Sequence, residues 1–350
     1  MPLVVANHPQ LDTAALAYPG VRVERASGVG IADVIASLGR MVRERAPQAV
    51  FYSELASRKL LRALLGGTRD APRVVYIPHG FSEKRQDWAR GTAFQDIAVL
   101  YGQHAFDQLA AFGVAGYLHH FIVSGNVRRR YHAMHEATFR VRLAALGLEP
   151  RPDLRTVLYA PTWDDALGSS SFFPAFAAMV RELPTGWRLI AKLHPHLDRH
   201  AATLDDLARQ CRGRDVHLVR GTPLSLPFLD LADAYVGDMS SLAYDFLGSG
   251  RPMFFTNAAA GTAADAAGSR LFACGSVVAP DRYGEIYRII DDAWASDADR
   301  FGEARAALER YTHAPERTLE DVAEEMDDVL AGPPPTWMYA KLDPPPAAPR

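Results

Sequence analysis

Short apolar runs alternate with longer amphipathic stretches along most of this chain. In the first half we expect strands at LVVA near the N-terminus and at residues 48–53, 73–78, 96–102 and 119–125. The intervening stretches, among them 31–46, 53–65 and 103–113, are rich in helix-forming residues. This alternation is typical of an α/β fold built on parallel strands.

The second half repeats the pattern more regularly. Apolar runs predict strands at 156–161, 187–195, 216–221, 234–238, 251–257 and 275–280. Helices are expected around 172–183, 199–212, 225–233, 240–249, 283–296, 298–311 and 318–331. The strands are mostly continuous apolar runs, which indicates a parallel sheet covered by helices on both faces.

A segment with little apolar periodicity separates the two halves. Residues 143–155 contain a glycine and two prolines, so we place a domain boundary within them. The sequence thus predicts an α/β domain over 1–148, a second over 149–332, and a Pro-rich extended or disordered tail over 333–350. Two open α/β domains joined by one linker would leave a cleft, where ligands commonly bind.

Composition narrows the class of protein. The chain has 350 residues, 48% of them hydrophobic and 23% charged, which are values of a globular protein. No stretch reaches the ~18 uncharged apolar residues of a spanning helix, and the start lacks the pattern of a secretory signal. Two cysteines, Cys211 and Cys274, are too few for a disulfide framework or a thiolate zinc site. We therefore expect a cytoplasmic protein.

The net charge of -3 conceals an asymmetry between the halves. Residues 1–150 hold 18 Lys and Arg against 12 Asp and Glu (+6), and residues 151–350 hold 20 against 29 (-9). The basic run Arg128–Arg130 could engage an anionic acceptor or the inner face of a membrane, or it could be a solvated helix surface. Nucleic-acid binding is not expected, because the chain is acidic overall and has no recognisable module.

The first candidate for chemistry is His79, in Pro-His-Gly directly after the strand 73–78. The carboxyl ends of parallel strands are where open α/β sheets bind ligands, and a histidine side chain suits general-base work near neutral pH. A loop histidine that caps a helix is the alternative.

Two further candidates follow strands of the second half. Thr162 and Trp163 lie in YAPTWDD, where the threonine could cap a helix and the indole could face a base, a ribose or the core. His194 lies in KLHPHL and is suited to donate a hydrogen bond to a phosphate. His194 and His196 could begin a metal site, but no third ligand stands at a convincing spacing, so we expect no metal.

The last candidate is the segment GDMSSLAYD, in which a strand runs into a helix start. Free backbone N–H groups and the hydroxyls of Ser240 and Ser241 could cradle a phosphate, with Asp245 one turn further on. A serine N-cap with no further role is the alternative. Neither a Walker A motif nor a GxGxxG fingerprint occurs, which argues against P-loop NTPases and ordinary NAD enzymes.

Taken in order, these motifs resemble those of the CDP-glycerol glycerophosphotransferase family, which includes teichoic-acid primases and polymerases and related capsule polymerases. The resemblance covers about residues 73–257 and is carried by VVYIPHGFSEK, VSGNVRRRY, VLYAPTWDD, RLIAKLHPH and LADAYVGDMSSLAYDFLGSGRPMFF. It implies a GT-B fold, with two Rossmann-like parallel-sheet domains facing a central cleft. It further implies transfer of a polyol phosphate from a CDP-polyol to a hydroxyl of a polyol-phosphate or glycan acceptor, lipid-linked or free, with release of CMP and no cofactor.

The resemblance also implies roles for individual residues. His79 would be the general base, and His194 would hold the diphosphate. The residues that it places at the substrates are Gly80, Lys84, Pro161, Thr162, Trp163, Ser240, Ser241 and Asp245.

One block departs from the family pattern. The family commonly has His-Gly-Thr-Pro-Leu-Lys, whereas this chain has His-Gly-Phe-Ser-Glu-Lys at 79–84. The change bears on the identity of the acceptor and of the polyol more than on the type of reaction. A GT-B glycosyltransferase that uses a nucleotide sugar and a non-catalytic nucleotide-binding protein of a polysaccharide cluster remain the alternatives.

Overall fold

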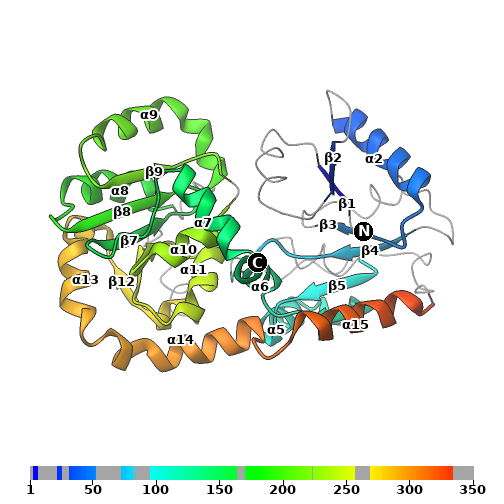
Figure 1. Ribbon diagram of the computed structural model, residues 1–350. Helices are drawn as coiled ribbons and strands as arrows, with labels where there is room; N and C mark the ends of the chain where they lie inside the picture. The colour runs from blue at the N-terminus through cyan, green and yellow to red at the C-terminus, as the bar shows by residue number, and fades with distance from the viewer. Residues whose placement is uncertain are drawn as a thin grey trace. The chain divides into compact units, whose positions relative to one another are not determined.

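The chain folds into two units, each built on parallel strands (Figure 1). The computed structural model describes residues 3–6, 22–25, 31–52, 72–81, 83, 95–163, 170–222, 224–256 and 269–333. One unit comprises Met1–Phe81, Arg85–Arg130 and Arg310–Arg350, and the other comprises Ser82–Lys84 and Tyr131–Glu309. Apart from the short stretch Ser82–Lys84, the chain passes from one unit to the other within two helices, α6 (Val127–Met134) and α14 (Asp297–His313).

The first unit contains a four-stranded parallel sheet in the order β3-β4-β5-β6. Its strands are β3 (Ala49–Tyr52), β4 (Arg73–Tyr76), β5 (Ile97–Leu100) and β6 (His120–Val123). A separate parallel pair joins β1 (Leu3–Ala6) to β2 (Arg22–Arg25). The helical segments of this unit are α2 (Ile31–Arg45), α5 (Gln103–Ala111), the 3₁₀ turn η1 (Ala115–Tyr117) and α15 (Leu319–Ala331).

The C-terminal helix α15 packs on this first sheet. Val322, Met326 and Val329 lie against a core made by Val75, Ile97, Val99 and Ile122. The helix begins at a capping box, in which the Thr318 hydroxyl accepts from the Asp321 N–H and the Asp321 carboxylate accepts from the Thr318 N–H. The apolar face of α15 is therefore explained by its contact with strands that lie about 200 residues earlier in the sequence.

The second unit contains a six-stranded parallel sheet in the order β12-β11-β10-β7-β8-β9. Its strands are β7 (Arg155–Ala160), β8 (Trp187–Lys192), β9 (Val216–Val219), β10 (Ala234–Gly237), β11 (Met253–Thr256) and β12 (Ser276–Val278). The helical segments are α7 (Glu136–Ala145), α8 (Phe172–Arg181), η2 (Pro195–His200), α9 (Ala201–Gln210), α10 (Leu226–Leu231), α11 (Ser241–Phe246), η3 (Leu247–Ser249), η5 (Leu271–Cys274), η6 (Pro280–Glu285) and α13 (Ile286–Trp294).

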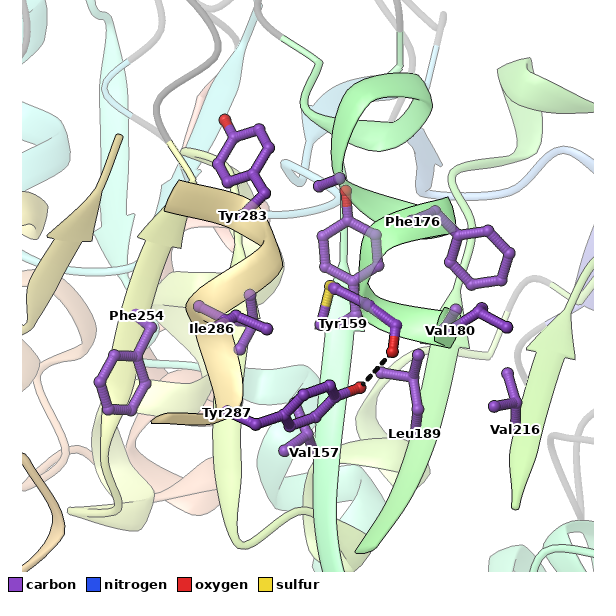
Figure 2. Packing of buried hydrophobic residues seen from close by; sticks show 14 of the residues in the cluster. Val157, Tyr159, Phe176, Val180, Leu189, Val216, Phe254, Tyr283, Ile286 and Tyr287 are labelled. Atoms are coloured by element: carbon purple, nitrogen blue, oxygen red, sulfur yellow. Dashed lines mark hydrogen bonds between the residues drawn. The ribbon is translucent and has the colours of Figure 1, made fainter. Parts of the chain in front are cut away.

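One face of this sheet packs against α8, η6 and α13 in a dense apolar core (Figure 2). Val157 and Leu189 contribute from neighbouring strands, Phe176 from α8, and Ile286 and Tyr287 from α13. The Tyr287 hydroxyl donates to the Met179 carbonyl at 3.0 Å, so this buried polar atom is paired. The core fixes the strands rigidly, and the loops at their carboxyl ends are positioned with them.

The expected strands are confirmed, and the expected division of the chain into domains stays a prediction. The strand runs predicted between residues 48 and 280 all contain observed strands, and the helix expected at 53–65 lies outside the described residues. By contacts, the first unit includes residues up to Arg130 and regains the chain from Arg310. The chain returns to the first unit because α15 covers the first sheet.

Residues 334–350 of the predicted tail lie outside the described residues. Among described helices, none is both long and apolar enough to span a bilayer.

Candidate functional site

The strand order of the second unit reverses between β7 and β10. Along the chain, β8 and β9 are added on one side of β7, and then β10, β11 and β12 are added on the other. At such a reversal the loops after the two central strands diverge to opposite faces, which opens a crevice at the carboxyl edge of a sheet. The loops that start there are Pro161–Trp163 after β7 and Asp238–Ser240 after β10.

The two strands approach closely at this point. Gly237 pairs with Ala160, and a Cβ atom on Gly237 would lie 2.6 Å from the Ala160 carbonyl oxygen. Only glycine fits that spacing, because real Cβ atoms do not come so near a backbone atom. Gly237 therefore allows the next residue, Asp238, to lie beside the loop after β7.

Asp238 organises that loop. Its side chain is 2% exposed; Oδ2 accepts from the backbone N–H of Thr162 at 2.9 Å and of Ser171 at 3.0 Å. Oδ1 accepts from the Thr256 hydroxyl at 2.9 Å. Burial raises the pKa of Asp238 to about 6, although these hydrogen bonds act in the opposite direction. We did not single out Asp238 from the sequence; its place directly after a strand was the available signal.

A chain of hydroxyls extends from Asp238 into the core. The Thr256 hydroxyl also lies 2.8 Å from that of Ser171, which in turn lies 2.8 Å from the Tyr159 hydroxyl. All three side chains are buried. Such a connected network fixes the start of α8 and the end of β7, because each member would lose a hydrogen bond if it moved.

The structure places Thr162 and Trp163 differently with respect to solvent. Pro161 and Thr162 are buried, and Thr162 is held through its backbone N–H, whereas Trp163 is half-buried. The Trp163 indole lies 6.4 Å from the His194 ring and 5.1 Å from the His196 ring, measured between centroids. The sheet thus brings together Trp163 and His194, which were predicted separately, because β7 and β8 are neighbours.

His194 presents a defined tautomer at the end of β8. Its Nδ1 accepts from the backbone N–H of His196 at 3.2 Å, and His194 caps the 3₁₀ helix η2. A neutral imidazole that accepts at Nδ1 carries its proton at Nε2. The ring is half-buried, and its Nε2–H is a hydrogen-bond donor of the kind that a phosphate oxygen requires.

Lys192 supports the loop that carries His194. Its Nζ donates to the Leu193 carbonyl at 3.1 Å, and the side chain is buried. Burial lowers the pKa of Lys192 to about 8, while the charge of Asp198 raises it.

Across the described part of the chain, no cluster of three or more His, Cys, Asp and Glu side chains could hold a metal ion.

Ser240 serves as a helix cap. Its hydroxyl accepts from the Ala243 N–H at 3.4 Å and lies 3.2 Å from the Tyr235 hydroxyl. Ser241 is half-buried at the first position of α11, a helix of six residues. Asp245 is 2% exposed, so its carboxylate lies in the interior of the second unit. The predicted contacts of Ser240, Ser241 and Asp245 with a ligand stay predictions.

In the first unit, His79 and Gly80 follow the carboxyl end of β4. His79 is exposed and Gly80 is half-buried. The loop is held by the buried Tyr101, whose hydroxyl donates to the Pro78 carbonyl at 2.7 Å. Lys84 lies outside the described residues.

The unusual residues after Gly80 have structural partners. Phe81 is buried, and its ring lies 4.5 Å from that of His104 within the first unit. Glu83, which belongs by contacts to the second unit, accepts hydrogen bonds there from the Ser269 hydroxyl and from the Arg270 N–H. The departure from His-Gly-Thr-Pro-Leu-Lys therefore adds packing and hydrogen bonds of its own.

Arg130 of the basic run also has a structural role. Its Nη1 donates to the Ser124 carbonyl at 2.6 Å, and burial, followed by the charge of Arg317, lowers its pKa. Arg130 is therefore part of the packing of the first unit. A role for Arg128 and Arg129 toward an anionic acceptor stays a prediction.

Comparison with known families gives one match. Residues 133–261 match the family described as CDP-Glycerol:Poly(glycerophosphate) glycerophosphotransferase. This segment includes β7, β8, β10 and the loops that carry Trp163, His194 and Ser240. The resemblance predicted from the motifs is thus confirmed over this part of the chain. No curated protein sequence matches the chain significantly.

Solved structures show what the fold is similar to. The wall teichoic acid polymerase TagF aligns with a TM-score of 0.52 at 15% identity, over 88% of this chain and 79% of that one. A histidine variant of TagF soaked with CDPG aligns with a TM-score of 0.60 at 13% identity, over 94% and 86%. The S. aureus MnaA structure with UDP aligns with a TM-score of 0.57 at 10% identity, over 93% and 86%. At such identities the likeness concerns the fold alone, and it confirms the expected α/β fold of the GT-B class.

Proposed function

Because residues 133–261 match the glycerophosphotransferase family, we propose that this protein transfers a polyol phosphate from a CDP-polyol to an acceptor hydroxyl, with release of CMP. Glycerol phosphate is the group that the family description suggests. The observation that carries the proposal is the pairing of Trp163 and His194 beside the reversal point of the second sheet, within the matched segment. The product would belong to a teichoic-acid-like or capsular polymer of the cell surface.

The second unit would bind the donor. The Nε2–H of His194 would donate to the diphosphate, because its Nδ1 is occupied by the His196 N–H. The half-buried face of Trp163 would lie along the nucleotide, with Thr162 in the same loop and Ser241 at the start of α11 as further contacts. A fixed donor of this kind stabilises the charge that develops on the leaving phosphate.

The first unit would supply the general base. The oxygen of the acceptor hydroxyl forms a bond to the phosphorus of the polyol phosphate, while the bond from that phosphorus to the bridging oxygen breaks. The hydroxyl proton passes to His79, and CMP leaves with the bridging oxygen. Phosphoryl transfer depends mainly on positioning and charge stabilisation, so a base and an anion-binding loop are sufficient parts.

The acceptor would be a polyol phosphate or a glycan, free or lipid-linked. Arg128 and Arg129 follow β6 in a first half with a charge of +6, which is the sign that a polyanionic acceptor requires. We also propose a cytoplasmic enzyme, in line with the low cysteine content, and contact of this basic segment with a membrane surface stays a prediction.

Nucleotide binding tests the proposal directly. We expect CDP and CMP to raise the melting temperature, and CDP-glycerol or CDP-ribitol with an acceptor to yield CMP. His194→Ala should weaken CDP binding about 10- to 100-fold, because a hydrogen bond to a charged group is worth about 1.5–3 kcal/mol. His217→Gln is the matched control, since His217 lies on β9, away from the carboxyl-end loops. Equal loss in both variants would contradict the assigned role of His194.

The same assay separates the alternatives. Stabilisation by UDP instead of CDP would favour a glycosyltransferase that uses a nucleotide sugar, an alternative supported by the likeness to a UDP-bound fold. Tight CDP binding without CMP release on any acceptor would favour a non-catalytic nucleotide-binding protein. The altered residues Phe81 and Glu83 are the feature that favours this last alternative.

A further inference from the structure

Tyr283 is a buried tyrosine close to the carboxyl edge of the second sheet. It lies on η6, the turn that follows β12, and its side chain is part of the large core of this unit. The residue is 3% exposed. No role in binding or catalysis was predicted for it from the sequence.

The Tyr283 hydroxyl is buried and lacks a hydrogen-bond partner in the described part of the chain. Two other tyrosines of the same core, Tyr287 and Tyr159, have hydroxyl partners. The Tyr287 hydroxyl donates to the Met179 carbonyl, and the Tyr159 hydroxyl is paired with that of Ser171. Tyrosine is usually placed so that a buried hydroxyl finds a partner, and an unpaired one costs free energy. An unpaired hydroxyl at a candidate site therefore points to a ligand group.

The direction of the side chain agrees with this interpretation. Figure 2 shows the Tyr283 hydroxyl directed away from Ile286 and Tyr287, toward the same end of the sheet as the Tyr159 hydroxyl. That end carries Asp238. Burial, followed by the negative charge of Asp238, raises the pKa of Tyr283, so the hydroxyl stays protonated and can donate.

We propose that the Tyr283 hydroxyl donates a hydrogen bond to a hydroxyl group of the bound nucleotide donor. The proposal rests on the proposed function, and it adds a contact from η6, the turn that follows the edge strand β12. A neutral hydroxyl is preferred over a phosphate, because the Asp238 carboxylate acts on the same region. The ribose and the alditol both offer such a group.

Tyr283→Phe removes this hydroxyl and leaves the ring. We expect the dissociation constant of the donor to rise about 3- to 10-fold, as for one hydrogen bond between neutral groups. We expect the melting temperature of the unliganded variant to be unchanged or higher, because an unpaired buried hydroxyl is lost. Titration calorimetry with CMP and with CDP-glycerol separates the sources: weaker binding of both indicates the ribose, and weaker binding of CDP-glycerol alone indicates the alditol.

Tyr287→Phe is the matched control, since it removes a hydroxyl that is already paired. It should lower the melting temperature and leave the dissociation constants unchanged. If the wild type binds these ligands and Tyr283→Phe binds them equally well, the inference is overturned and the proposed function stands. A lower melting temperature in unliganded Tyr283→Phe would also overturn it, because the hydroxyl would then have a structural partner. If the wild type binds neither ligand, the proposed function fails and the inference fails with it.

Discussion

Replacing His79 with alanine is expected to slow polyol-phosphate transfer about 10²- to 10⁴-fold, the usual contribution of a general base. His79 follows the carboxyl end of β4 and is exposed, so its loss should not disturb the core of the first unit. Affinity for CDP should stay within about two-fold, because the proposed diphosphate contact comes from His194. The measurement is CMP release under single-turnover conditions, combined with CDP titration.

His120→Ala is the matched control for this experiment. His120 opens β6 and so lies at the amino edge of the same parallel sheet, opposite to the edge that carries His79. It is half-buried and has no assigned role. A normal rate for His79→Ala, or an equal loss for His120→Ala, would remove His79 from the mechanism. A loss of CDP affinity in His79→Ala would instead assign it to donor binding.

The strands could be predicted from the sequence because each is a short apolar run with turn residues at its ends. TVLYA and WRLIAK, for example, became β7 and β8 with all but the first residue of β7 buried. The position of α15 could not be predicted in the same way. Val322 and Met326 reveal an apolar face, but nothing local identifies the sheet that it covers. For the same reason, the return of the chain to the first unit from Arg310 could not be predicted from the sequence.

The candidate site was only partly predictable. His194 and Trp163 belong to recognisable motifs, and their proximity follows once β7 and β8 are neighbours. Asp238 acts through partners distant in sequence, namely Thr162 and Thr256, and the role proposed for Tyr283 depends on the end of the sheet at which its hydroxyl lies. Such roles depend on strand order, which a single sequence does not specify. Ser240 shows the reverse case, in which the hydroxyl of a motif serves as a helix cap.

Replacing Asp238 with alanine is expected to destabilise the second unit by about 2–4 kcal/mol. The change leaves the buried N–H groups of Thr162 and Ser171 and the Thr256 hydroxyl without their acceptor, and each unpaired donor costs about 1–3 kcal/mol unless water replaces it. The loop that carries Trp163 should lose its order, so CDP affinity should fall together with stability. Urea unfolding and CDP titration measure the two effects, and full stability in Asp238→Ala would show that the network is not cooperative.

Asp238→Asn separates the charge from the hydrogen bonds. An amide can keep its oxygen toward the two N–H groups and donate to the Thr256 hydroxyl, so the loss at neutral pH should be small. The pKa of about 6 lies above the ordinary value of 3.8, which means that the folded state binds more protons than the unfolded state between these values. The contribution of Asp238 to stability is therefore fully present below pH 3.8 and is lost as the pH rises through 6.

The stabilities of the wild type and of Asp238→Asn should therefore depend differently on pH. Between pH 4 and pH 7.5, the stability of the wild type minus that of Asp238→Asn should fall by about 2–3 kcal/mol, since one pKa unit corresponds to about 1.4 kcal/mol. The difference between the proteins is the quantity to measure, because carboxylates with lowered pKa values, such as Glu285 and Asp321, act in the opposite direction in both. A constant difference across this range would mean that the Asp238 carboxylate is not desolvated in the folded protein. Asp238 would then be ionised to the same extent in the folded and unfolded states, and the loop after β7 would be held by a charged acceptor that makes the same contribution at every pH in this range.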